Sequence, residues 1–144
     1  MKNNFIIFFF IFLFLCKNTS ADQFLFETQK IDVTEGGKYI YATNGKAVSA
    51  DKNLIIEANN FEYSKELQKL KAYEGNAIIN SDNLKIEFNE IEFDQVNLIV
   101  TAKNEVKIYD NKKKLFIETD IIIYDRKFGT IESQTKSFLK DKFK

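Results

Sequence analysis

Three glutamates recur at one position of a repeated pattern and are the first candidates for chemistry in this chain. Glu57, Glu87 and Glu118 lie 30 and 31 residues apart, and each follows a leucine by three residues. Carboxylates can act as a general acid and base when two of them converge on one cleft. Nothing in the spacing requires such convergence, so we expect these glutamates to be solvated on the outward side of a sheet.

Most other catalytic chemistry is excluded by composition. The chain has no His and no Trp, and its single cysteine is Cys16. Triads that use imidazole, and zinc sites with His or Cys ligands, need residues that are absent here. Five glycines are too few for calcium-binding nonapeptide repeats, and Gly36-Gly37 lacks the context of a phosphate-binding loop. We therefore expect no catalytic residue, no metal and no cofactor.

The elements that must position these residues follow from an internal repeat of about thirty residues. Phe24, Leu54, Leu84 and Leu115 begin four matching segments. The second half of the unit recurs as Ile40 and Ala42, Leu70 and Ala72, Val100 and Ala102, and Ile131 and Ser133. A period of this length indicates a supersecondary unit that buries its apolar face by stacking on its neighbours.

Within each copy the apolar residues alternate with polar ones, which predicts β-strands rather than helices. The alternation changes parity within each copy, so we expect one bulge or bend per repeat, at Asn59-Asn60, Asn89-Glu90 and Asp120. Turns between short strands are predicted at Gly36-Gly37, Asn44-Gly45, Glu74-Gly75-Asn76, Lys103-Asn104 and Asp110-Asn111.

The N-terminus is typical of a secretory signal peptide, residues 1–21, with Lys2, an apolar run from Phe5 to Leu15 and a cleavage site after Ala21. An uncleaved anchor and lipidation at Cys16 are the alternatives. The mature domain, residues 22–144, contains no cysteine and therefore no disulfide. It carries two more acidic than basic residues, which gives no electrostatic footprint for nucleic acid.

Lysines gather toward the C-terminus, at Lys112–Lys114 and at Lys136, Lys140, Lys142 and Lys144. Lysines on an exposed strand discourage unwanted strand pairing, and we prefer this interpretation. An anion site is the alternative.

The recurring phrase Ile40-Tyr-Ala42 to Ala47, followed by a Leu-x-Ile-Glu strand, returns at Leu70 and at Val100. It resembles the organic-solvent-tolerance (OstA-like, LptA-like) domain of the lipopolysaccharide-transport (Lpt) bridge proteins, which also forms the N-terminal part of the outer-membrane assembly protein LptD. The resemblance covers Phe24 to about Ser133. It implies an all-β, open, twisted β-jellyroll of about four repeats, whose two sheets form a V-shaped groove.

The resemblance also implies a function. The chain would be a periplasmic protein of a Gram-negative envelope that passes lipopolysaccharide toward the outer membrane, and association with the outer membrane is left open as an alternative. It would be no enzyme but a passive conduit, with an ATP-driven exporter upstream. The expected lipid-binding groove consists of the inward-facing residues Val33, Ile40, Ala42, Leu54, Ile56, Phe61, Tyr63, Leu70, Ala72, Leu84, Ile86, Ile91, Phe93, Val100, Ala102, Ile117 and Tyr124.

Ordinary core packing is the competing interpretation of each of these residues. The same two interpretations apply to Ala42, Ala72 and Ala102. Their small inward side chains either leave room for a ligand or allow tight packing. The expected partners are the acyl chains of lipid A, and other Lpt components or a second copy joined by edge strands near Phe24–Val33 and Ile131–Phe138. The alternative function is a secreted structural or adhesive β-solenoid without lipid cargo. The chain could be a complete bridge protein or the N-terminal part of a longer assembly protein.

Overall fold

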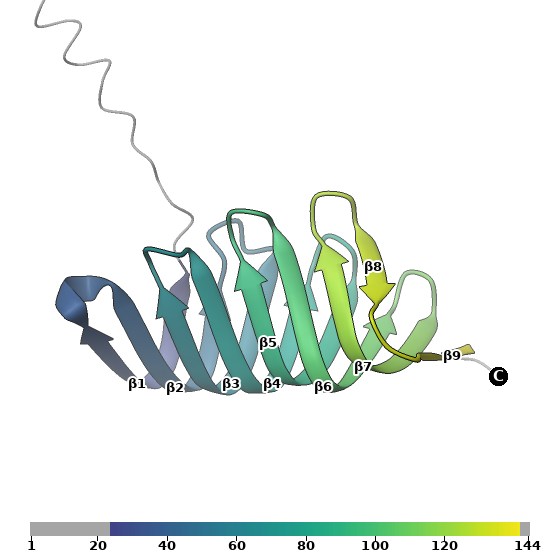
Figure 1. The fold of residues 1–144 in the computed structure, drawn as a ribbon, viewed down its shortest axis with the longest axis horizontal. Coiled ribbons are helices and arrows are strands. Elements are labelled where there is room, and N and C mark those ends of the chain that lie inside the picture. The colour runs from purple at the N-terminus through teal and green to yellow at the C-terminus, as the bar shows by residue number, and fades with distance from the viewer. Residues whose placement is uncertain (1–23, 142–144) are drawn as a thin grey trace, which may run out of the picture.

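The computed structural model describes residues 24–141, which form one open antiparallel sheet (Figure 1). Strands that follow each other in the chain pair with each other from β1 to β8, and β9 pairs with β7 beside β8. The predicted all-β, open jellyroll is therefore confirmed, whereas the predicted signal peptide lies outside the described residues. The elements are β1 (Leu25–Thr34), the 3-10 turn η1 (Glu35–Gly37), β2 (Tyr39–Val48), β3 (Leu54–Ser64), β4 (Lys69–Ile79), β5 (Leu84–Asp94), β6 (Ile99–Asp110), β7 (Leu115–Asp125), β8 (Thr130–Ser133) and β9 (Phe138–Asp141).

Each thirty-residue copy of the sequence corresponds to a pair of neighbouring strands. Leu54, Leu84 and Leu115 are the first residues of β3, β5 and β7. The turns stack on one another as well: the amide of Gln95 donates to the carbonyl of Gln68 at 3.0 Å, and that of Arg126 donates to Leu98 at 3.0 Å. Successive copies are thus joined both along their strands and at their turns, as expected for stacked units.

The long strands bend in the middle, and the aligned bends form the floor of a trough with two walls (Figure 1). We call the walls arm A and arm B. Arm A ends at η1 and at the turns 65–68, 95–98 and 126–129, and arm B ends at the turns 49–53, 80–83 and 111–114. In β3 the buried positions are Leu54, Ile56 and Ala58 and then Phe61 and Tyr63, so the parity changes at the bend. Both halves of the strand therefore face the interior.

Part of the predicted turn pattern is wrong. Asn44-Gly45, Glu74-Gly75 and Lys103-Asn104 lie at the bends inside β2, β4 and β6, so these strands are long, and each of the strands from β1 to β7 bends. There are therefore two bends per repeat rather than one. Asn44, Glu74 and Asn104 have positive φ angles of 52°, 55° and 63°. A bend of this kind needs the same left-handed backbone as many tight turns, which is why Asn-Gly at a bend resembles a turn in the sequence.

Side chains from both arms fill the space between them and form one core. Leu54, Ile56, Leu70, Ile86 and Ile91 are fully buried. Among the described residues, no buried side-chain nitrogen or oxygen lacks a hydrogen-bond partner. Within the same part of the chain, no helix is long and apolar enough to span a membrane.

Substitution of Gly75 should test the bend. A Cβ at this position would overlap the carbonyl oxygen of Glu57 and lie 2.8 Å from the Cα of Ala58, both in the neighbouring strand. Because backbone atoms would have to move, we expect Gly75→Ala to lower the free energy of unfolding by about 3 kcal/mol, measured by urea denaturation. Gly36→Ala is the control, because nothing lies within 4 Å of its added Cβ. Only the positive φ angle at this position should then lower the free energy of unfolding, by about 1 kcal/mol. Equal losses in the two variants would contradict this account.

Candidate functional site

The inner face of arm A consists of rows in which small and large side chains alternate. Paired positions across neighbouring strands give the row Ala42, Phe61, Ala72, Ile91, Ala102 and Ile122. Each of these side chains is at most 2% exposed. The large residues from β3, β5 and β7 occupy the space beside the alanines of β2, β4 and β6. In this structure the alanines therefore allow tight packing and leave no room for a ligand.

Most of the predicted groove residues lie on the inner faces of the two arms. Ile40 and Ile117 are half-buried, whereas Val33 is 58% exposed because it lies on the edge strand β1. Whether a ligand contacts these residues stays a prediction. The fourteen buried members are Ala42, Leu54, Ile56, Phe61, Tyr63, Leu70, Ala72, Leu84, Ile86, Ile91, Phe93, Val100, Ala102 and Tyr124.

Sequence reasoning missed several residues of the same interior. The alternation of β1 could have identified Phe26, two residues after Phe24, and the thirty-residue spacing could have identified Ala47 and Ala77. No local pattern indicates that distant aromatic rings meet. The interior residues outside the predicted groove set are Phe24, Phe26, Ala47, Ala58, Ala77, Ile79, Phe88, Val106, Ile108, Ile122 and Ile131.

Aromatic rings connect the two arms near the first strands. The Phe24 ring lies edge-on to Tyr63 and to Phe93, with ring centroids 5.9 Å apart in both pairs. Phe26 on arm B lies 6.0 Å from Phe61 on arm A, also edge-on. Edge-to-face pairs of this kind are favourable beyond the area they bury. They hold the arms together over the first half of the trough.

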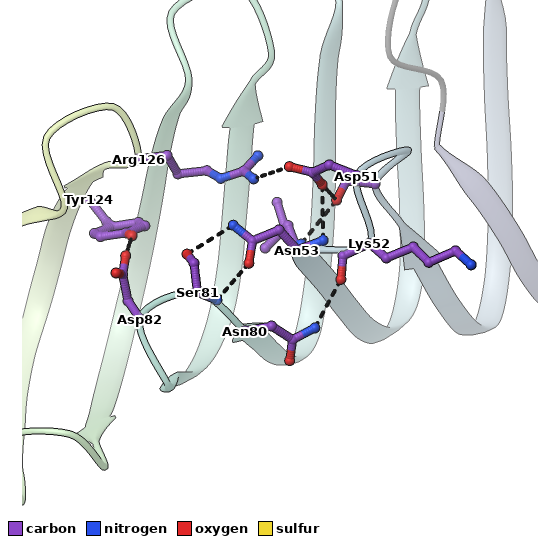
Figure 2. A network of polar contacts seen from close by, with 10 residues as sticks. Asp51, Lys52, Asn53, Asn80, Ser81, Asp82, Tyr124 and Arg126 are labelled. Carbon is purple, nitrogen blue, oxygen red and sulfur yellow. Dashed lines mark hydrogen bonds and ion pairs between the residues drawn. The ribbon is translucent and has the colours of Figure 1, made fainter.

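Polar bridges close the mouth of the trough above these rings (Figure 2). Figure 2 shows Arg126, from the β7–β8 turn of arm A, reaching Asp51 in the β2–β3 turn of arm B, with a nitrogen–oxygen distance of 2.8 Å. The Arg126 guanidinium also lies 5.2 Å from the centre of the Phe93 ring. Beside it, the Tyr124 hydroxyl donates to the carboxylate of Asp82, in the β4–β5 turn of arm B.

The environment of Asp51 keeps its carboxylate charged. Burial raises the pKa of Asp51, but hydrogen bonds from the Ser49 hydroxyl, the Asn53 amide and the Arg126 guanidinium together hold the pKa below its ordinary value of 3.8. The turns of arm B are also tied to each other, because the Ser81 amide donates to the Asn53 side chain at 2.6 Å and Asn53 donates back to the Ser81 hydroxyl at 2.9 Å. The bridge from Arg126 therefore ends on turns of arm B that are held to each other by hydrogen bonds.

The interior opens at the C-terminal end of the sheet. A cavity of about 530 Å³ lies there between arm A, which supplies β8, and arm B, which supplies β9. Ile122 and Ile131 line it from arm A, and Leu115, Ile117 and Leu139 line it from arm B. Here both arms contribute apolar side chains to the wall of one open space.

The repeated glutamates lie elsewhere, on the outer face of arm B. They share one row of paired positions with Lys46, Asn76 and Lys107, so a strand lies between each two of them. Strands are about 4.8 Å apart, which puts Glu57 about 10 Å from Glu87, and Glu87 about 10 Å from Glu118. The ammonium of Lys85 donates to Glu87 at 2.8 Å and lowers the pKa of that carboxyl. These glutamates do not converge on a cleft, and the described residues contain no cluster of His, Cys, Asp and Glu that could hold a metal ion.

Comparison with known proteins identifies the fold but not the family. No protein-family model matches the sequence, and no curated protein matches it. The fold is similar to the crystal structure of LptH, the LptA homologous periplasmic component of the conserved lipopolysaccharide transport device from Pseudomonas aeruginosa, with a TM-score of 0.69 and 9% sequence identity. The match covers 83% of this chain and 94% of LptH. The expectation that this chain is no enzyme agrees with the likeness, since LptH is a transport component.

Removal of the Arg126 side chain should weaken the mouth of the trough. We expect Arg126→Ala to lower the free energy of unfolding at pH 7 by about 1 kcal/mol, since Asp51 is half exposed and solvent screens the pair. The pKa of Asp51, followed by NMR, should rise toward 3.8. A carboxyl with a lowered folded pKa contributes stability that is present above its unfolded pKa and lost as the pH falls through its folded pKa. The stability difference from the wild type should therefore shrink below about pH 3.8.

Lys127→Ala is the matched control, since it removes a neighbouring exposed cation from the same turn. We expect it to leave the pKa of Asp51 unchanged. An unchanged Asp51 pKa in Arg126→Ala would show that the bridge does not form in solution.

Proposed function

We propose that this chain is a periplasmic component of a lipopolysaccharide-transport system, in which it holds lipid acyl chains between the two arms and joins neighbouring subunits through its edge strands. The observation that carries the proposal is the likeness of fold to LptH over 83% of this chain. The continuous apolar inner face described above supports it independently, because an acyl chain needs such a surface to leave the membrane.

The energetics allow such cargo only if the arms can separate. Burying a methylene group contributes roughly 0.8 kcal/mol, so a chain of about twelve carbons gains on the order of 10 kcal/mol at most. Entry between the arms would break the contact of Phe24 with Phe93 and the bridge from Arg126 to Asp51. It would also part the side chains of the shared core, including Phe26 from Phe61, while the arms remain joined at the bends. Separation of the arms is therefore the movement that the proposal requires.

Transport through this chain would be passive. Rows of similar inward residues, such as Leu70, Phe93, Val100 and Tyr124 in paired positions, offer neighbouring sites of similar apolar character. A lipid could shift between such sites without large changes in free energy, so direction would have to come from another component.

The edges of the sheet suit head-to-tail assembly. β1 leaves one long side of the sheet without a partner strand, and its half in arm A is exposed, with Ile31 at 45% and Val33 at 58%. The short strands β8 and β9 form the opposite side. Pairing of β1 from one copy with β8 and β9 of the next would extend the trough and bury Val33 on its inner face.

A structural or adhesive β-solenoid without cargo is the second candidate function. The specific observation that favours it is the filled interior, in which Ile86, Ile91, Val100 and Ala102 have no exposed surface. A permanently closed trough would give rigidity and no path for a lipid.

Lipid extraction distinguishes the two functions. The protein, purified without detergent from the periplasm of a Gram-negative host, should carry lipid that organic extraction and mass analysis identify as lipid A. A periplasmic protein without an apolar trough, purified in the same way, should carry none. Extracts without lipid from repeated preparations would favour the structural solenoid.

Substitution at the β1 edge tests assembly. Val33→Glu puts a charge on the inner face of the free edge, where a second copy would bury it, so self-association should weaken at least tenfold in a light-scattering concentration series. Val96→Glu is the matched control, because Val96 is 67% exposed and lies in the β5–β6 turn, away from both edges. Monomers at every concentration of the wild type, alone and with other bridge components, would count against assembly through this edge.

A further inference from the structure

The cavity at the C-terminal end of the trough exists because the last strand of the sheet is broken. β8 and β9 have 4 residues each, whereas β7 has 11. The two short strands pair with opposite halves of β7. Between them no strand pairs with β7, and the connecting segment contacts its centre through the Thr135 hydroxyl, which accepts hydrogen bonds from the amides of Asp120 and Ile121. In β6, two strands further in, Val100 on arm A and Ile108 on arm B have no exposed surface. At the end, Ile117 and Ile131 are only half-buried and Leu139 is 63% exposed.

The walls of this cavity suit an apolar ligand. Ile117, Ile131 and Leu139 provide branched aliphatic surface from both arms. The hydroxyl of Ser133, also on the wall, already has partners: it lies 2.8 Å from the Thr119 hydroxyl and donates to the Thr135 carbonyl at 2.7 Å. A polar ligand would therefore find few free hydrogen-bonding groups there, whereas a hydrocarbon chain needs no hydrogen-bond partner.

The size of the cavity limits its occupant to something small. A volume of about 530 Å³ lies within the range of about 300–1,000 Å³ that is usual for small-molecule sites. It can take one acyl chain, and it is too small for a folded protein segment of any length.

Two charged residues line the cavity, and of these the Lys113 side chain is exposed whereas that of Asp110 is buried. Lys113 lines it and belongs to the run Lys112–Lys114 at the tip of arm B. Its ammonium lies 3.8 Å from the carboxylate of Asp110, beyond close hydrogen-bond distance, and its side chain is 68% exposed. This exposed ammonium can turn toward an anionic group at the mouth of the cavity.

Together these observations lead to one proposal. We infer that the cavity between β8 and β9 is a site for a single acyl chain with an anionic headgroup, the chain lying against Ile117, Ile131 and Leu139 and the headgroup meeting Lys113. The inference rests on the proposed function, and it goes further by placing the first binding step at the C-terminal end, before the arms separate along the rest of the trough. The site is then the place where a lipid enters or leaves the chain.

Binding of dodecyl phosphate tests the site. Calorimetry on the full mature chain, at concentrations where light scattering shows monomers, should find one molecule bound per chain. Leu139→Glu should weaken binding at least tenfold, because it places a charge inside the apolar wall. Leu67→Glu is the matched control and should bind as the wild type does, since Leu67 is 60% exposed and lies in the β3–β4 turn. Both positions are exposed, so thermal unfolding should show that both variants fold.

The headgroup is tested separately. Lys113→Gln should weaken dodecyl phosphate several-fold and leave the binding of dodecanol unchanged, and inorganic phosphate alone should not bind. Equal affinity of Leu139→Glu and wild type for dodecyl phosphate would overturn the inference. So would a Leu139→Glu variant that loses self-association but binds the probe normally, since a second copy would then be what covers this end.

The results also separate this inference from the proposed function. If the purified protein carries lipid A but dodecyl phosphate does not bind at Leu139, the transport function is supported and the site at the C-terminal end is wrong. If neither lipid binds, both proposals are wrong.

Discussion

The constraint on which this structure depends is the bend in the middle of each strand. A flat meander of this length would expose one apolar face to water, since each arm alone has nothing to pack against. The bend turns the two halves of the sheet toward each other, so that the same face covers itself. It requires left-handed backbone at Asn44, Glu74 and Asn104 and close approach of neighbouring strands at Gly45 and Gly75. Without those backbone positions the repeats could still pair, but they could not bury their core.

Once the arms face each other, side-chain packing decides whether the space between them is available to a ligand or is filled by the protein's own side chains. The alternation of alanines with Phe61, Ile91 and Ile122 fills arm A, and the aromatic contacts of Phe24 and Phe26 fill the first half of the gap. The mouth is then closed by few bridges, of which the one from Arg126 to Asp51 spans the arms directly. A closed interior with few polar bridges at its mouth is compatible with a trough that opens for cargo, and equally with one that never opens. The open cavity at β8 and β9 is what distinguishes this end from the rest.

The charged side chains lie on the outer face and at the tips of the arms. The outer face carries rows of acids and lysines, and cross-strand pairs among them, such as Glu27 with Lys46, favour one strand register. At the tips of the arms, the ion pair of Asp51 with Arg126 joins the two arms, and Lys113 lies beside the cavity. The acid and base chemistry that the repeated glutamates first suggested therefore finds no place in the fold.

The sequence by itself determined the repeat, the strands and the inward-facing set, because a period of two residues within a period of thirty can be read without coordinates. Leu54, Ile86 and Phe93 were identified in this way and are buried. The tertiary structure decided the rest. Left-handed residues serve turns and bends alike, so only the sheet showed that Asn44-Gly45 and Glu74-Gly75 lie inside strands. Contacts between arms, such as Arg126 with Asp51, join residues 75 positions apart that no periodicity relates. Only packing in three dimensions revealed that the alanines are enclosed and that the open space lies at one end.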